Sequence, residues 1–455
     1  MNPRGYPQKI DLNMKLLVIG GGGREHALAW KLLQASHPFL RSGRIYVAPG
    51  NAGTLLEEGL ENVSISEIPE LIEFARKESI AFTVVGPEAP LAEGIVDAFR
   101  AAGQKIFGPT RQAARLETSK AFAKGFMERH GIPTAAYAVF SSPAEAHKYI
   151  DEKGVPIIVK ADGLAAGKGV TVAKTLEEAH AAVDALLPKG ARSDKAGSVI
   201  VIEEYLEGEE VSFIIMADGR HVLPLATSQD YKRLNDGDEG PNTGGMGACS
   251  PVPFITPAIH ARIMREVINP VMRGMEKEGE PYTGFLFAGL MIAPDGSVKV
   301  LEFNCRLGDP ETEVIMPRLK SNLVALIENA LNGTLDKVEA EWDRRAAVAV
   351  VMTAEGYPDS PRKGDTVRGL RDPSTIVEER ERERDFYIFH AGTAVGGKSG
   401  KDVVTAGGRV LCVTALADSS KLAQRRAYEV AEQIYFEGCH MRRDIGYRAV
   451  NHNRN

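Results

Sequence analysis

The chain has 455 residues, of which 44% are hydrophobic and 25% charged, a balance typical of a globular protein with two to four domains. Its formal net charge of −6 and its pI near 6.0 argue against a general attraction to nucleic acid. Its four cysteines are scattered and form no C-x-x-C pair, which favours reduced cytosolic thiols over a disulfide framework or a zinc site. No apolar run is long enough to cross a bilayer. We therefore expect a cytoplasmic protein that binds neither membrane nor nucleic acid.

The N-terminal region alternates short apolar runs with helical stretches. Residues 1–13 lack the apolar core of a signal peptide, and we expect them to be a disordered extension or a mis-assigned start. From residue 14 to residue 118, KLLVI, IYVA, FTVV and KIFG predict strands, and helical periodicity fills the gaps between them. This alternation predicts a doubly wound, Rossmann-like parallel sheet.

The turn GGGGREH, residues 20–26, follows the first predicted strand and leads into a helix. A dinucleotide fingerprint needs a third glycine and an acidic residue that closes the second strand, and both are missing here. Two interpretations remain: a site for a single phosphate at the helix N-terminus, or a tight turn alone.

The stretch KADGLAAGKGV, residues 160–170, resembles a phosphate-binding P-loop at first sight. It does not match the P-loop pattern, because Gly163 and Gly167 are too close together and Gly169 occupies the position of the hydroxyl that binds magnesium. Residues 138–207 around it alternate strands and helices in a small block. The longer strands predicted after residue 208 suggest an α+β core of residues 119–137 and 208–344. A small mixed domain, residues 345–455, follows.

Two further segments could bind ligands. In VIEEYLEGEEVS, residues 201–212, a strand leads into acidic residues, which suits an adenine and ribose site but also an ordinary acidic turn. The irregular stretch of residues 229–251 is long for a loop inside a domain, and its glycines with Lys232 and Arg233 favour contact with an anion.

The stretch VKVLEFNCRLGDPETE, residues 298–313, is the best candidate for a metal site. On a strand, Glu302 and Asn304 point to one face, and we expect Leu301 and Phe303 to point into the core. A carboxylate and an amide oxygen suit Mg²⁺, and Arg306 could neutralise a transferring phosphoryl group. The alternative is an edge strand with solvated polar residues.

Together these stretches resemble the ATP-grasp superfamily, and within it the phosphoribosylamine–glycine ligase (glycinamide ribonucleotide synthetase) family of purine biosynthesis. The likeness runs from about Met14 to about Ala449. Its most specific motifs are LVIGGGGREHALAW, VGPEAPLAEGI, KADGLAAGKGV, GPNTGGMGA, EFNCRLGDPETE and RRDIGYRA.

The resemblance implies an N-terminal pre-ATP-grasp domain that binds phosphoribosylamine, a central ATP-grasp domain whose mobile lid is formed by residues 138–207, and a C-terminal domain. It implies that Glu302 and Asn304 bind Mg²⁺ or Mn²⁺, and that Arg306, Asp309 and Lys232 are catalytic. The ATP site that it implies consists of Lys120, Lys160, Gly163, Gly167, Lys168, Gly169, Glu203, Leu206 and Glu210. The substrate site that it implies consists of Gly22, Gly23, Arg24, Asn51, Glu88, Asn242, Thr243, Gly244, Gly245, Met246 and Lys363.

The resemblance also implies a reaction, in which ATP drives the ligation of glycine to 5-phosphoribosylamine through glycyl phosphate. We expect a monomer with small-molecule substrates. Alternatives are another ATP-grasp ligase such as a biotin carboxylase or a formate-using purine enzyme, a nucleotide sensor without turnover, and a dinucleotide oxidoreductase. A sensor should lack the metal pair that is present here, and an oxidoreductase needs the acidic residue that is missing after the second strand.

Overall fold

The strands and helices of the N-terminal region form a parallel sheet covered on both faces. The computed structural model describes residues 14–35, 44–164, 169–187, 199–370, 386–397 and 399–452, so the expected extension of residues 1–13 lies outside the described residues. The five strands, in the spatial order β3-β2-β1-β4-β5, are β1 (Leu16–Gly20), β2 (Ile45–Pro49), β3 (Leu60–Asn62), β4 (Phe82–Val85) and β5 (Ile106–Phe107). All neighbouring strands are parallel, which confirms the doubly wound sheet.

The order of the strands reverses between β1 and β4, so the loops after these two strands open on one crevice. Alternate residues of β1 enter different cores: Leu16 and Val18 pack in the cluster that contains Leu28, whereas Leu17 and Ile19 pack in another. The helices of this region are α1 (Gly23–Ala35), α2 (Ala52–Leu56), α3 (Ile68–Lys77), α4 (Glu88–Glu93) and α5 (Ile95–Ala101).

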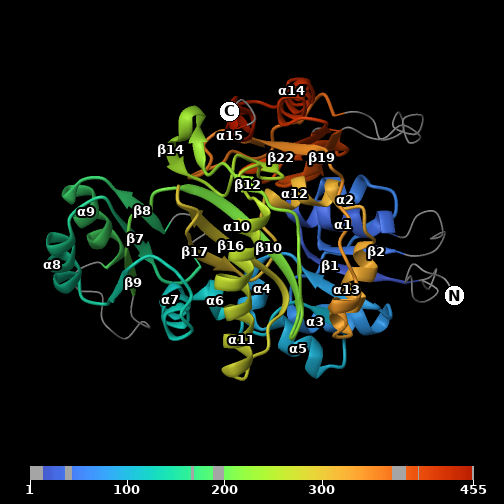
Figure 1. Cartoon of the computed structure of the whole chain (residues 1–455). Coiled ribbons are helices and arrows are strands. Elements are labelled where there is room, and N and C mark those ends of the chain that lie inside the picture. The colour runs from blue at the N-terminus through green and yellow to red at the C-terminus, as the bar shows by residue number, and fades with distance from the viewer. Residues whose placement is uncertain are drawn as a thin grey trace.

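A second, antiparallel sheet forms a separate small block that projects from one side of the molecule (Figure 1). Its strands, in the order β6-β9-β7-β8, are β6 (Tyr137–Phe140), β7 (Ile157–Ala161), β8 (Val170–Ala173) and β9 (Ile200–Glu204), with helices α8 (Pro143–Lys153) and α9 (Leu176–Leu186). Buried residues such as Ile150, Val159 and Val183 give the block its own core.

The central sheet lies between this block and the N-terminal sheet. Its antiparallel strands, in the order β11-β10-β16-β17, are β10 (Glu209–Asp218), β11 (Val222–Pro224), β16 (Thr283–Ile292) and β17 (Val298–Asn304). The helices around it are α6 (Arg115–Thr118), α7 (Lys120–Arg129), α10 (Pro257–Ile263), α11 (Asn269–Lys277), α12 (Glu311–Ile315) and α13 (Leu323–Leu331). Ser119 separates α6 from α7 and caps α7, since its hydroxyl accepts a hydrogen bond from the Phe122 N–H at 3.1 Å.

The C-terminal sheet is antiparallel and includes two strands from the central part of the sequence. Its strands, in the order β12-β15-β18-β22-β19, are β12 (Gln229–Asp230), β15 (Gly247–Ser250), β18 (Ala346–Thr353), β19 (Phe386–His390) and β22 (Arg409–Ala417). The sheet therefore crosses the domain boundary that the sequence suggests after residue 344. The remaining elements are the hairpins β13 (Arg233–Asn235) with β14 (Glu239–Asn242) and β20 (Thr393–Gly396) with β21 (Asp402–Thr405), and the helices α14 (Ser420–Ala431) and α15 (Tyr447–His452).

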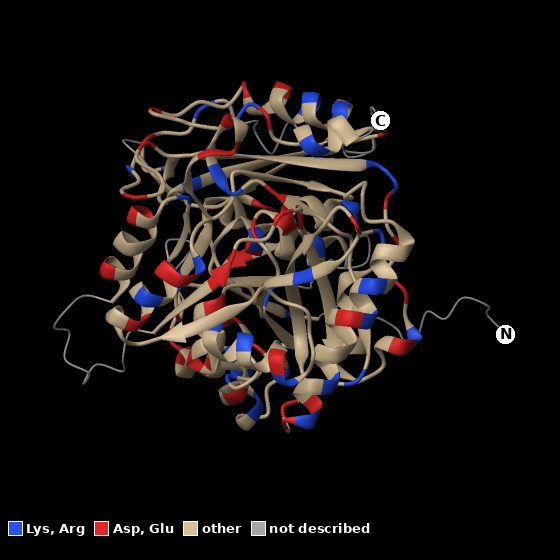
Figure 2. Cartoon of the chain, turned by 60° about the vertical axis from the view of Figure 1, so that its left-hand side comes forward, with Lys and Arg blue, Asp and Glu red and all other residues tan. Residues whose placement is uncertain are grey.

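Acidic and basic residues alternate over the outer helices, and neither sign dominates the face in view (Figure 2). No helix among the described residues is long and apolar enough to cross a membrane. All four cysteines are free, and Cys249, Cys305 and Cys412 are buried.

A buried polar contact joins the N-terminal sheet domain to the C-terminal sheet. The backbone N–H of His390, at the end of β19, donates to Nδ1 of His26 on α1 at 2.9 Å. Asn51 donates to the His390 carbonyl at 2.7 Å. Burial, together with the neighbouring His26, lowers the pKa of His390 to about 3, so this imidazole is neutral in the folded protein.

We expect His390 to make the protein less stable in acid. Below the ordinary histidine pKa of about 6.5, His390 is protonated in the unfolded chain but stays neutral in the folded chain. The free energy of unfolding therefore falls by about 1.4 kcal/mol per pH unit between roughly pH 6.5 and pH 3. Urea unfolding between pH 7 and pH 5 measures this slope. It should be shallower in His390→Gln and unchanged in the control His452→Gln, whose histidine is exposed. Equal slopes in wild type and His390→Gln would contradict the assignment.

Candidate active site

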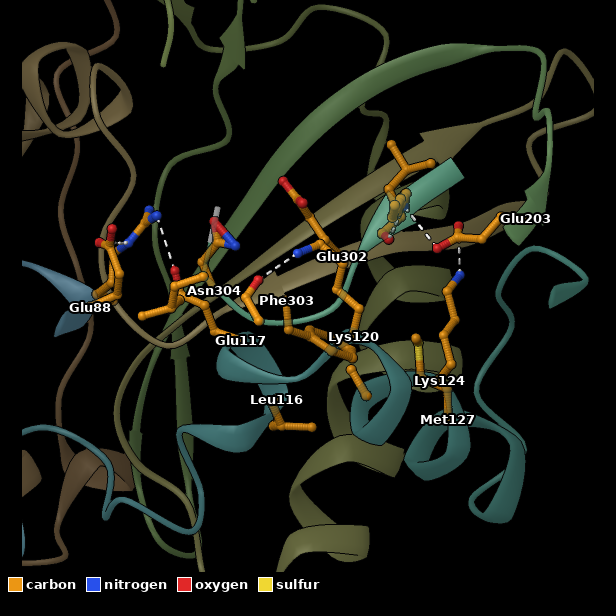
Figure 3. A pocket seen from close by; sticks show the side chains of 16 residues that line it. Glu88, Leu116, Glu117, Lys120, Lys124, Met127, Glu203, Glu302, Phe303 and Asn304 are labelled. Atoms are coloured by element: carbon orange, nitrogen blue, oxygen red, sulfur yellow. Dashed lines mark hydrogen bonds and ion pairs between the residues drawn. The ribbon is translucent and has the colours of Figure 1, made fainter. Parts of the chain in front are cut away.

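One pocket collects polar side chains from several distant parts of the chain. It lies where α6 and α7, the strands of the small block and β17 meet, and it contains about 640 Å³ of space, part of it open to solvent. Figure 3 shows Lys120, Glu302 and Asn304 on one side and Lys124 with Glu203 on the other. Of the predicted site residues, the pocket is lined by Glu88, Lys120, Lys160, Gly163, Glu203, Glu302, Asn304 and Arg306.

Lys120 and Lys160 reach the pocket from different elements. Lys120 begins α7, and its Nζ donates to the Gly163 carbonyl at 2.8 Å. Lys160 lies on β7, and its Nζ is 2.9 Å from Glu203 and 3.4 Å from the Leu301 carbonyl. Burial lowers the pKa of Lys120 although the nearby Glu302 carboxylate opposes the shift. An anion that entered the pocket would therefore find two cations already in place.

The side chain of Glu203 is taken up by ion pairs within the protein. Its side chain is buried between Lys160 and Lys124, and the ion pair with Lys124 is 2.9 Å long. Lys124 also donates to the Thr134 hydroxyl at 2.8 Å. Sequence reasoning missed Lys124. The available signal was its position one helical turn after Lys120, which puts both lysines on one face of α7.

The strand β17 carries the expected metal ligands, but its side chains do not alternate as predicted. Gly289 pairs with Glu302 and Leu290 pairs with Val300, so Leu301 is an extra residue that forms a β-bulge. Val300 and Phe303 both pack in the core, whereas Leu301 is half-buried and lines the pocket. The expectation that Leu301 points into the core is wrong, because the bulge shifts the alternation by one residue.

Glu302 and Asn304 both reach the pocket, and their oxygens suit Mg²⁺, which needs only a few protein ligands. Burial tends to raise the pKa of Glu302, but Lys232, Lys160 and Lys120 outweigh it and lower the pKa, so the carboxylate is ionised. Within the described part of the chain, no group of three or more histidine, cysteine, aspartate or glutamate side chains is placed to hold a metal. A metal here would take its other ligands from a nucleotide and water.

Lys232 lies between the carboxylates of Glu210 and Glu302. Its Nζ bonds to the Glu210 carboxylate and lies 3.9 Å from Glu302. Burial raises the pKa of the nearby Asp230 to about 8, although the charge of Lys232 opposes the shift. Glu210 and Leu206, predicted to bind ATP, do not line the pocket in this conformation, and Leu206 lies half-buried just beyond the end of β9.

Arg306 is held between two carboxylates at the edge of the pocket. Its Nε is 3.2 Å from Glu88, which begins α4, and its Nη2 is 3.1 Å from Glu117 on α6. Glu88 comes from the crevice after β4, where the order of the first sheet reverses. The pocket thus reaches the N-terminal domain. Glu117 is a second residue that sequence reasoning missed.

Asp309 is bound by an arginine of the C-terminal sheet. Arg409, on β22, lies 3.1 Å from the Asp309 carboxylate and donates to the Asp309 and Gly244 carbonyls at 2.7 Å. Burial tends to raise the pKa of Asp309, but Arg409 and Arg24 outweigh it and keep the pKa below its ordinary value. No motif marks Arg409 in the sequence, because its partners are about 100 and 165 residues away.

The carboxylate of Glu25 occupies the space next to the glycine turn after β1. The Gly22 N–H donates to Glu25 at 2.6 Å, and the guanidinium of Arg24 donates to Glu25 at 2.5 Å and to the Leu307 carbonyl at 3.2 Å. A side chain at Gly20 would collide with Glu25, and one at Gly23 would collide with Glu313. The tight-turn interpretation therefore explains these glycines in part. Arg24 and Gly22 nevertheless face Asp309.

Asn51 is fully engaged in structural contacts. It caps α2, where its Oδ1 accepts from the Thr54 N–H at 3.1 Å, and its Nδ2 donates to the carbonyls of Gly21 and His390. The structure thus places Asn51 next to the glycine turn but uses its polar atoms within the protein.

The loop of residues 242–246 packs against the Asp309 region. Its Thr243 hydroxyl donates to the Lys232 carbonyl at 2.8 Å, and its Gly244 N–H donates to the Tyr357 hydroxyl at 2.9 Å. A side chain at Gly245, whose φ is +123°, would meet Pro310 at 2.5 Å. Among the loop residues predicted to bind substrate, Asn242 ends β14 and Met246 is buried in the core of the C-terminal sheet.

The remaining predicted residues lie on the small block and on the C-terminal domain. Gly163 and Gly169 flank the loop that includes Gly167 and Lys168, and those two lie outside the described residues. Lys363 is exposed. The neighbouring Gly364 N–H donates to the Thr405 carbonyl at 2.7 Å, which places Lys363 beside β21 rather than in the pocket.

Comparison with known proteins agrees with this geometry. Three family models match the chain: the phosphoribosylglycinamide synthetase N domain at residues 14–117, its ATP-grasp (A) domain at residues 118–312 and its C domain at residues 347–448. The phosphoribosylamine–glycine ligase of Ralstonia nicotianae is 59% identical over 96% of this chain and 100% of its own length. The crystal structure of the phosphoribosylamine–glycine ligase of Thermotoga maritima aligns with a TM-score of 0.78 and 37% identity over 95% of this chain and 100% of that one.

The biotin carboxylase domain of the Hydrogenobacter thermophilus 2-oxoglutarate carboxylase, solved with MgADP, has a TM-score of 0.68 but only 16% identity over 94% of this chain and 91% of that one. This second likeness concerns the fold alone, and a biotin carboxylase is therefore the weaker interpretation. With its three matching domains in order and a 59% identical relative of full length, the chain belongs to the phosphoribosylglycinamide synthetase family.

Proposed function

We propose that this chain is an ATP-dependent ligase that joins glycine to 5-phosphoribosylamine and releases glycinamide ribonucleotide, ADP and phosphate, a step of de novo purine biosynthesis. The observation that carries the proposal is the convergence of Lys120, Lys160, Glu302 and Arg306 on one pocket. The names of the full-length relatives support the choice of substrates.

In this proposal ATP lies in the pocket with its phosphates against Lys120 and Lys160. Backbone groups at Glu203 and Leu206 receive the adenine, and Glu210 receives the ribose when the small block closes. Glu302 and Asn304 hold Mg²⁺ or Mn²⁺, which neutralises phosphate charge when it is bound. The loop of residues 163–169, with Gly167, Lys168 and Gly169, covers the phosphates.

The chemistry takes two steps. A carboxylate oxygen of glycine attacks the γ-phosphorus of ATP, which breaks the bond to the β-phosphate oxygen and yields ADP and glycyl phosphate. The amine of phosphoribosylamine then attacks the glycyl carbonyl, phosphate leaves with the bonding electron pair, and the amine loses a proton. Arg306 stabilises the charge on the transferring group, and the transfer depends on placement more than on a strong base. Asp309, ionised beside Arg409, can accept the proton.

Phosphoribosylamine occupies the crevice of the N-terminal sheet, between Glu88 and the turn with Gly22, Gly23 and Arg24. The loop of residues 242–246 closes the site beside Asp309, Lys232 orients the acidic groups around Glu302, and Lys363 adds a contact to the phosphate. Glycyl phosphate hydrolyses in open water, so closure of the block protects it. We further propose that the protein is a cytoplasmic monomer that binds neither nucleic acid nor membrane.

Release of ADP should require glycine and phosphoribosylamine together, because glycyl phosphate forms only from glycine and turns over only when the amine consumes it. Coupled-enzyme detection of ADP with each substrate alone and with both tests this requirement. Turnover that is equally fast without glycine would contradict the proposed reaction.

Glu302→Gln should lower kcat by about a hundredfold or more, because a neutral amide holds the metal less firmly at the phosphates. Steady-state kinetics at several Mg²⁺ concentrations measure the loss. The matched control is Glu204→Gln, which removes an exposed carboxylate of β9 that is paired with Lys299 of β17. Near-normal turnover of Glu302→Gln would remove Glu302 from the metal site.

A further inference from the structure

The guanidinium of Arg306 is fixed on three sides. Besides the carboxylates of Glu88 and Glu117, the Leu307 carbonyl accepts from its Nη1 at 3.1 Å. A planar guanidinium bound at several edges cannot rotate freely, so its orientation is set by these partners.

The two carboxylates differ in burial and in what else they hold. The Glu88 side chain is 31% exposed, whereas that of Glu117 is only 7% exposed. The second oxygen of Glu117 accepts a hydrogen bond from the Cys305 N–H at 2.6 Å. Glu117 therefore binds the side chain of Arg306 and also the backbone N–H of Cys305. Cys305 directly follows Asn304, the last residue of β17.

Burying this carboxylate is costly. Burial raises the pKa of Glu117 despite the opposing charge of Arg306. A well-packed apolar residue would often stabilise a buried position as well as an ion pair does. A carboxylate at this position thus points to a requirement for the orientation of Arg306 rather than for stability alone.

Glu117 also lies at a junction between domains. The N-domain family model ends at residue 117 and the ATP-grasp model begins at residue 118. The short helix α6 packs on β17 and on α7, the helix that carries Lys120 and Lys124. Glu117 is therefore the partner that ties Arg306 to the helix preceding α7.

We infer that Glu117 is a positioning residue for Arg306: it aims the guanidinium at the transferring phosphoryl group while it fixes the end of β17. This role rests on the proposed function, because it assumes that Arg306 acts in the phosphoryl transfer. Glu117 lines the pocket, but its two carboxylate oxygens are taken up by Arg306 and by the Cys305 N–H.

Steady-state kinetics of four forms of the full-length protein test the inference: wild type, Glu117→Gln, Arg306→Ala and the double variant. Glu117→Gln should keep an acceptor for the Cys305 N–H but lose the charge that aims Arg306. We expect it to lower kcat about ten- to a hundredfold while the KM for ATP stays within about twofold. In the Arg306→Ala background the same change should have no further effect on kcat.

Glu278→Gln serves as the matched control, since it also removes a carboxylate paired with an arginine, Arg129, at 3.0 Å but outside the pocket. It should leave kcat unchanged. If Glu117→Gln does not fold, Glu117→Asp, which keeps the charge but is too short to reach both partners, is measured by the same criteria.

An unchanged kcat, a kcat loss of equal size in the Arg306→Ala background, or a loss that appears only as a raised KM for ATP would overturn the positioning role. A wild-type protein that releases no ADP with all substrates present would instead contradict the proposed function. The two failures are therefore distinguishable.

Discussion

The repulsion between buried cations is the constraint on which this site depends. A pocket that receives a polyphosphate must keep several positive side chains close together before the ligand arrives, and each of them has lost part of its hydration. Here Lys120, Lys124 and Lys160 line one pocket, and Glu203 lies between two of them. Arg306 and Arg409 are balanced in the same way, by Glu117 with Glu88 and by Asp309.

This balance explains why the carboxylates come from so many elements. Glu203 comes from the small block, Glu117 from the junction helix α6, and Glu88 from the N-terminal sheet, so each ion pair also joins two parts of the molecule. An arriving phosphate competes with these carboxylates for the same cations. Domain arrangement and ligand binding are thus coupled through charge neutralisation.

Local patterns of apolar and polar residues in the sequence predicted most of the fold. Alternation of apolar runs and helices identified the parallel sheet, and the run from Glu302 to Arg306 identified the strand that carries the polar end of the site. Glu117 and Arg409 escaped notice because their roles depend on partners that only folding brings near, whereas the position of Lys124 one helical turn after Lys120 could have marked it. Leu301 was misplaced for another reason: a bulge is a property of the pairing between two strands, and one strand alone does not reveal it.

The C-terminal sheet has a consequence for how the chain can be divided. Its strand β18 is covered on one edge by β15, which is contributed by residues 247–250, almost a hundred positions earlier in the sequence. A fragment that starts near residue 345 would leave that edge of β18 with unpaired N–H and C=O groups and with an apolar face uncovered, which invites pairing with other chains. The third family domain is therefore a unit of sequence but not of folding. The pairing of β15 with β18 also attaches the preceding loop, residues 242–246, to the sheet that carries Arg409.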